Sequence, residues 1–167
     1  MTRLQKLTRC ALLTAAALVV FVIESQIPPL TAIPGIKPGL SNIFTLFALQ
    51  VLGPGWAFAL LLIRVTLGSV ITGQMMAFIY SMAGGLLAFA VMAALRKMPE
   101  KKLWVSSVLA AMAHNVGQIA AAIAVTGTKE ILYYLPVLLL SGMIAGSFTG
   151  ICAQLVLARL RNQRWFH

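Results

Sequence analysis

The sequence predicts an all-α integral membrane protein with six transmembrane helices and both termini in the cytoplasm. Of its 167 residues, 60% are hydrophobic, and the mean hydropathy is +0.95. Only 10% are charged, whereas a soluble domain carries about 25% charged residues. Apolar blocks fill nearly the whole length, so residues 1–167 are expected to form a single membrane domain.

The positions of the basic residues predict the topology. The formal net charge is +10, with thirteen Lys and Arg residues against three acids. Lys and Arg near the ends of spans are retained in the cytoplasm, so this pattern indicates orientation and a weak attraction to anionic lipid rather than a nucleic-acid partner. Ten of the thirteen flank apolar blocks on one expected side: Arg3, Lys6, Arg9, Arg96, Lys97, Lys101, Lys102, Arg159, Arg161 and Arg164.

The apolar blocks predict the helices in order. The first follows a basic start and is read as an uncleaved span, because no small-x-small cleavage site comes after it. The second has only about a dozen residues, which is too few to cross a ~30 Å core unaided. It is therefore short or partly re-entrant, although a five-span alternative would place the 96–102 loop and the C-terminal tail outside. The predicted ranges are 10–26, 40–52, 55–73, 75–95, 103–125 and 131–158.

Two kinds of local pattern refine this arrangement. The proline-rich segment 27–40 is apolar but not helical, and it is either a lid over the outer mouth or an ordinary connector. Ser41-Asn42 can then cap the second helix. Small residues four apart predict close helix packing, within the molecule for the fifth and sixth helices and with a partner for the first. These faces are Ala113/Gly117/Ala121, Gly142/Gly146/Gly150 and Ala11/Ala15.

Arg64 is the strongest pointer to a site, because it interrupts the apolar run from Trp56 to Ile71. An unpaired arginine at a bilayer centre costs at least ~3 kcal/mol, and its guanidinium stays protonated. His114 and Gln118 share one helix face at a similar depth. One reading is an outward-open cavity for a polar or anionic group, and the other is a structural network in which Arg64 pairs with Glu24.

The composition argues against several enzyme classes. The chain contains no Asp, so it lacks the Asp-rich motif that binds diphosphate and magnesium, and it has no phosphate-binding Gly-Lys-Ser/Thr loop. The two cysteines, Cys10 and Cys152, lack metal-ligand spacing. The sequence therefore predicts a protein that is not an enzyme and has no cofactor or metal. Any energy for transport must come from another subunit.

Four segments resemble one family. Gly35-Ile36-Lys37-Pro38-Gly39-Leu40-Ser41-Asn42, Arg64-Val65-Thr66-Leu67-Gly68-Ser69, Tyr80-Ser81-Met82-Ala83-Gly84-Gly85 and His114-Asn115-Val116-Gly117-Gln118 are similar, in order, to the Gx transporter family. That family is also labelled heptaprenyl diphosphate synthase component I. Pro38 departs from its pattern, which has an aliphatic residue there.

The resemblance implies a function. The family is similar to the S components of energy-coupling-factor (ECF) transporters, six-helix proteins of the prokaryotic plasma membrane that capture a solute. A membrane coupling subunit and two cytoplasmic ATPases then drive uptake. It implies docking of the partner at Ala11 and Ala15, and its synthase label implies a competing accessory role in prenyl diphosphate or quinone synthesis. The solute-binding residues are then Arg64, His114, Asn115 and Gln118, with Asn42, Lys37 and Glu24 near the entrance.

Overall fold

The computed structural model describes residues 1–26, 37, 39–99 and 102–162, and in this part of the chain all regular structure is helical. One 3₁₀-helix, η2, precedes the last α-helix. The elements in order are α1 (Arg3–Gln26), α2 (Asn42–Val51), α3 (Pro54–Thr72), α4 (Met75–Ala94), α5 (Leu103–Thr126), η2 (Lys129–Tyr134) and α6 (Leu135–Asn162). The predicted all-α class is confirmed.

The helix limits follow the prediction within two residues except at two helix starts and one end. Helix α1 begins at Arg3 rather than residue 10, because its basic first turns favour a helix although hydropathy does not detect them. Helix α6 begins at Leu135 rather than residue 131. Pro136 has no N–H to donate and fits the first turn of a helix, and the six residues before α6 form the 3₁₀ segment η2. Helix α6 also continues four residues beyond 158, to Asn162.

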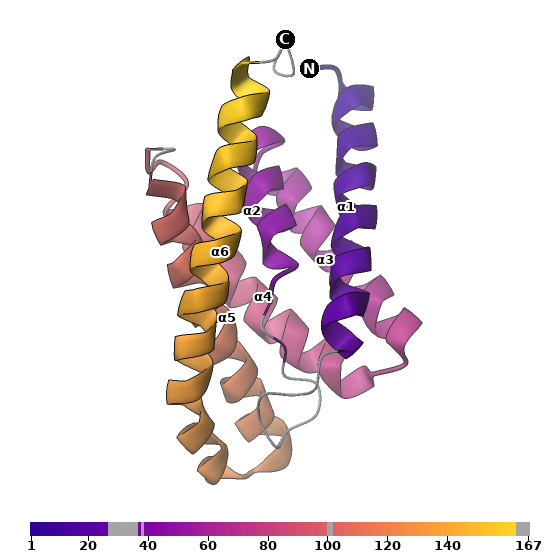
Figure 1. The fold of residues 1–167 in the computed structure, drawn as a ribbon. Coiled ribbons are helices and arrows are strands. Elements are labelled where there is room, and N and C mark those ends of the chain that lie inside the picture. Colours follow the sequence, from indigo (N-terminus) through magenta and orange to yellow (C-terminus); the bar gives the residue numbers. More distant parts are fainter. Residues whose placement is uncertain (27–36, 38, 100–101, 163–167) are drawn as a thin grey trace.

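Five of the helices are long and apolar enough to cross a membrane, and α2 is the exception. Its 10 residues span about 15 Å at 1.5 Å per residue. Helix α1 ends far from the N-terminus, and α2 starts inside the bundle and runs back toward it (Figure 1). The N-terminus, the α4–α5 turn and the end of α6 therefore lie at one end of the molecule, called the basic end below. This agrees with an even number of crossings.

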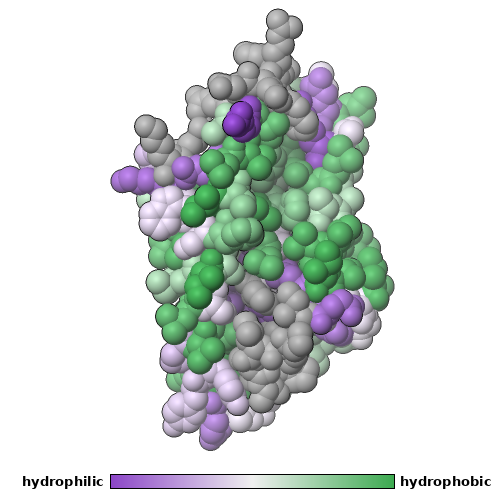
Figure 2. Space-filling view, viewed as in Figure 1, coloured by the Kyte–Doolittle hydropathy of each residue, from purple (hydrophilic) through white to green (hydrophobic). Residues whose placement is uncertain are grey.

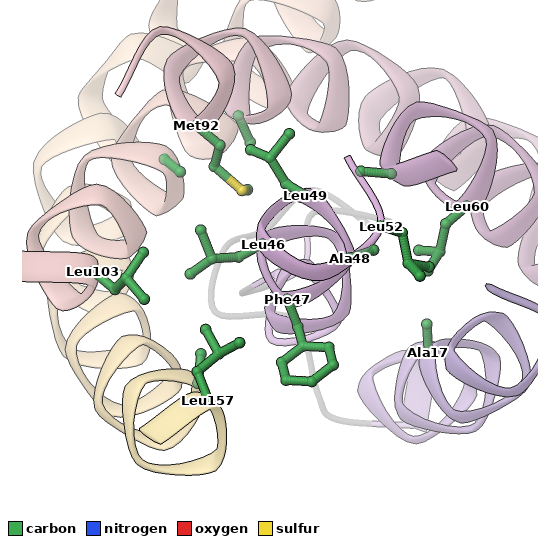
Figure 3. Close-up of a cluster of buried hydrophobic side chains, with 14 of the residues drawn as sticks. Ala17, Leu46, Phe47, Ala48, Leu49, Leu52, Leu60, Met92, Leu103 and Leu157 are labelled. Carbon is green, nitrogen blue, oxygen red and sulfur yellow. The ribbon is translucent and has the colours of Figure 1, made fainter. Parts of the chain in front are cut away.

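Helix α2 lies at the centre of the bundle rather than at its surface. Figure 3 shows its side chains radiating toward the surrounding helices, with Leu46 facing Met92 and Leu103. Leu46, Ala48 and Leu49 are at most 1% exposed. Because so short a helix is shielded from lipid by its neighbours, the protein itself supplies the environment that α2 needs.

The small-residue face of α6 lies in close contact with α5, and that of α5 lies in close contact with α4. A Cβ added to Gly146 would lie 2.8 Å from Val108 Cα, and one added to Gly150 would lie 2.6 Å from Trp104 Cα. A Cβ added to Gly117 would likewise lie 2.8 Å from Gly84 Cα of α4. These faces therefore pack within the molecule, as predicted.

We predict that the basic end faces the cytoplasm. A cysteine at position 98, in the α4–α5 turn, should resist a membrane-impermeant thiol reagent in intact cells. A cysteine at position 130, at the opposite end, should react. Both are to be made in a variant whose native Cys10 and Cys152 are replaced. Reaction at position 98 without reaction at position 130 would show that the basic end faces the outside.

Candidate functional site

Arg64 is buried, at 2% exposure, in the middle of α3. One terminal nitrogen, Nη1, donates to the Ser41 hydroxyl, and Nη2 donates to Asn42 Oδ1 at 2.9 Å. Asn42 is the first residue of α2, and Ser41 directly precedes the helix. The guanidinium therefore joins the middle of α3 to the start of α2 and is not left in an apolar setting.

Glu24 caps the start of α2 from a different helix. Its carboxylate accepts hydrogen bonds from the backbone N–H of Leu40 at 2.5 Å and of Ser41 at 3.1 Å. A negative charge is favourable at a helix N-terminus, where N–H groups lack partners. This charge lies next to Ser41, which also receives the Arg64 donor.

One prediction about these residues is wrong, and so is one of the two alternatives left open for Arg64. Ser41-Asn42 does not cap α2 through its side chains, because Arg64 occupies both of their oxygens and Glu24 takes the capping role. Glu24 and Arg64 do not pair directly in the described residues either. Ser41 connects them instead, with its N–H toward the carboxylate and its Oγ toward the guanidinium.

A second cation, Lys37, lies beside this network. It is 6% exposed, and its Nζ sits 3.9 Å from the centroid of the Phe21 ring of α1, which is a cation–π contact. Burial lowers the pKa of the Lys37 ammonium below its usual value, and the Glu24 carboxylate opposes this effect. Lys37 is thus enclosed rather than free at the surface.

His114 is held between two glycines that admit backbone close to its ring. A Cβ on Gly39 would lie 2.9 Å from His114 Cδ2, and one on Gly84 would lie 2.9 Å from Nδ1. Gly39 also has φ +78, which favours glycine. The same Gly84 position would place a Cβ 2.9 Å from Gln118 Cγ. His114 and Gln118 therefore share the α4-facing side of α5, and His114 reaches the start of α2.

Asn115 faces a different neighbour. Its Nδ2 donates to the Leu138 carbonyl of α6 at 2.5 Å, and Gly142 leaves the space that this amide fills. Its contacts therefore join α5 to α6. None of them places Asn115 with the other predicted site residues, which lie around the start of α2.

The cluster holds more positive than negative charge and several donors without a partner. Among the charged side chains of the described residues, Arg64, Lys37 and Glu24 are buried, which leaves one positive charge in excess. Buried donors normally find acceptors. The nitrogen atoms that make no hydrogen bond include Arg64 Nε, Lys37 Nζ, Asn42 Nδ2 and Gln118 Nε2. Such a set is suited to an anionic or oxygen-rich group.

The structure adds residues that sequence reasoning did not assign to the site. Ser41 receives Arg64, and Gly39 and Gly84 enclose His114. All three lie in the motif segments quoted above, but their roles depend on contacts between helices. Buried Thr45 and Ser69 also have hydroxyls without a hydrogen-bond partner. Residues 27–36, most of the predicted lid, lie outside the described residues.

The remaining predicted features lie away from this cluster. Ala11 and Ala15 are exposed on α1. Within the described ranges, no three His, Cys, Asp or Glu side chains are grouped so that they could hold a metal ion.

Glu24→Gln should destabilise the protein, because among the described residues it removes the one buried anion beside two buried cations. Leaving a buried charge without its counter-charge costs about 3 kcal/mol, so we expect a clearly lower melting temperature in detergent. Glu130→Gln is the matched control, since Glu130 is exposed on η2. Equal melting of the two variants would show that Glu24 does not hold α2 in place.

Comparison with known families matches residues 13–156 to the family described as heptaprenyl diphosphate synthase component I. Comparisons with curated proteins and with solved structures find no match. The matched segment includes every residue of the cluster around the start of α2 and confirms the resemblance found in the sequence. The chain is therefore a multi-pass membrane protein that belongs to the heptaprenyl diphosphate synthase component I family, the Gx transporter family.

Proposed function

We propose that this protein is a non-catalytic, solute-binding subunit of a membrane importer of the energy-coupling-factor type. Its ligand is a small anionic solute, and its site is the cluster around the start of α2. The excess buried positive charge of Arg64 and Lys37 over Glu24 is the observation that supports this proposal. A protein that held these groups only for packing would gain nothing from the second cation, because each buried charge loses hydration.

Some hydrogen-bond donors of the cluster are used within the protein, and others remain available to a ligand. Arg64 uses Nη1 and Nη2 to hold Ser41 and Asn42, so its Nε and its charge remain for a ligand. Gln118 has no partner for either end of its amide and can therefore donate or accept. His114 lies against Gly39 and Gly84.

The proposed partners follow from the same reading. The chain has no nucleotide-binding motif, so a membrane coupling subunit and two cytoplasmic ATPases would supply the energy. The coupling subunit would dock on Ala11 and Ala15, which face outward from α1. The host membrane is then the prokaryotic plasma membrane.

The family description favours a second candidate, an accessory subunit of heptaprenyl diphosphate synthesis. This role also needs no catalytic group in the chain. Affinity purification from cells that express the protein at native level separates the two candidates. Recovery of ATPases with a membrane coupling protein supports import, and recovery of a prenyl diphosphate synthase supports the accessory role.

Arg64→Ala should remove ligand binding. The charge-assisted hydrogen bond of a guanidinium contributes roughly 1.5–3 kcal/mol, so affinity should fall about ten- to hundredfold. The protein is purified gently, and native mass spectrometry measures the small molecule that it retains. His114→Ala should weaken retention less, because a neutral ring contributes less than a guanidinium.

The controls separate binding from folding. Lys129→Ala makes the same charge change at an exposed position and should retain the molecule. Melting of the ligand-free proteins measures the structural part of the Arg64 effect. Arg64→Ala that melts at a lower temperature but retains its ligand fully would refute the binding role.

Ala11→Trp with Ala15→Trp should weaken association with the coupling subunit while leaving the fold intact, because bulky side chains prevent close helix approach. Ala16→Trp is the matched control, since Ala16 is exposed on another side of α1. The measurement is co-purification of the coupling subunit from the same membranes. Unchanged yield in the double variant would place the docking surface elsewhere.

A further inference from the structure

A lateral groove opens between α1 and α6 over α2. Two hollows of 330 Å³ and 140 Å³ share Leu13 and Phe47 in their walls. Both α1 and α6 pack on α2, but no substantial contact joins them in the described residues. Figure 3 shows Phe47 projecting from α2 between Leu157 of α6 and Ala17 of α1. The residues that line the lateral groove include Arg9, Leu12, Leu13, Phe47, Val156 and Leu160.

The groove is apolar along its length and basic at one end. Leu12 and Val156 on its edges are 65% and 48% exposed. Arg9 lies at its rim, close to the basic end, with Val51 and Leu160. In Figure 2, hydrophobic residues cover the middle of the face between α6 and α1, and hydrophilic residues lie near its upper end and again on its lower part. This polarity matches a molecule with an apolar chain and an anionic head.

The size of the groove and the faces of α1 limit the occupant. An α-helix with side chains is about 10–12 Å across, so hollows of 330 Å³ and 140 Å³ admit a hydrocarbon chain but not a helix. At about 100° per residue, Ala11 and Ala15 point roughly 120–160° away from Arg9, although Ala15 lies only about 60° around α1 from Leu12. The groove therefore borders the face proposed for the coupling subunit at Leu12, and its other α1 residues, Arg9 and Leu13, lie on a different side of the helix.

We propose that the lateral groove binds one acyl chain of an anionic membrane phospholipid, whose headgroup lies beside Arg9. The bilayer supplies this ligand directly, because the groove is open to the lipid along α1 and α6. Anionic headgroups are attracted to basic side chains at the membrane surface. The proposal rests on the groove alone and does not depend on the solute site.

The test uses the full chain, reconstituted in equal amounts of phosphatidylglycerol and phosphatidylcholine and then extracted for native mass spectrometry. We expect the wild-type protein to retain one phosphatidylglycerol. Val156→Trp should fill the groove and lower this retention about tenfold, which corresponds to the loss of roughly two buried methylene groups. Leu155→Trp is the matched control, because Leu155 is 62% exposed on α6 and does not line the groove.

A second pair of variants tests the head. Arg9→Gln should remove the preference for phosphatidylglycerol over phosphatidylcholine, and Arg159→Gln should keep it, because Arg159 is exposed outside the groove. Circular dichroism and melting verify the fold, and Leu12→Trp fills the groove from α1 if Val156→Trp does not fold. Equal lipid retention in all folded variants would overturn the proposal. So would a dimer that excludes lipid from the wild-type protein.

Discussion

The buried charge of Arg64 is the constraint on which the rest of the structure depends. A guanidinium inside a membrane must find acceptors from other parts of the chain. It finds them at Ser41 and Asn42, and Glu24 then holds the adjoining N–H groups from α1. Three helices are thus tied together at one point. The position of α2 follows from this contact, since the helix is too short to be fixed by the bilayer.

The central place of α2 gives the molecule two separate surfaces. The polar start of the helix meets α1, α3 and α5, where the charged and amide side chains gather. Its apolar flank, at Phe47, meets α1 and α6, where the lateral groove opens. A helix that reached across the bilayer would pack along its whole length and leave less freedom for either feature. The shortness of α2 therefore contributes to both the candidate site and the lateral groove.

Much of this fold could be predicted from the sequence, because lipid imposes simple rules on length and charge. The clustered basic residues predicted that the N-terminus and the end of α6 would lie at one end, and the glycine spacing of α6 predicted its close packing. The polar contacts could not be predicted in the same way. Asn115 and His114 are neighbours in sequence, yet one faces α6 and the other faces α2 and α4. Helical periodicity separates their directions, but it does not say which helix lies in each direction.

The indirect link between Glu24 and Arg64 through Ser41 shows why such contacts could not be predicted from the sequence. Complementary charge makes a direct ion pair the simplest expectation. In the structure, the Glu24 carboxylate instead accepts hydrogen bonds from two backbone N–H groups just before α2. Without it, these N–H groups would lack an acceptor inside the protein. Each charge therefore satisfies polar groups near the start of α2, and their attraction acts across Ser41. With Lys37 also enclosed, the one carboxylate cannot neutralise both cations, and this charge imbalance is the feature that supports the proposed anion site over a closed structural network.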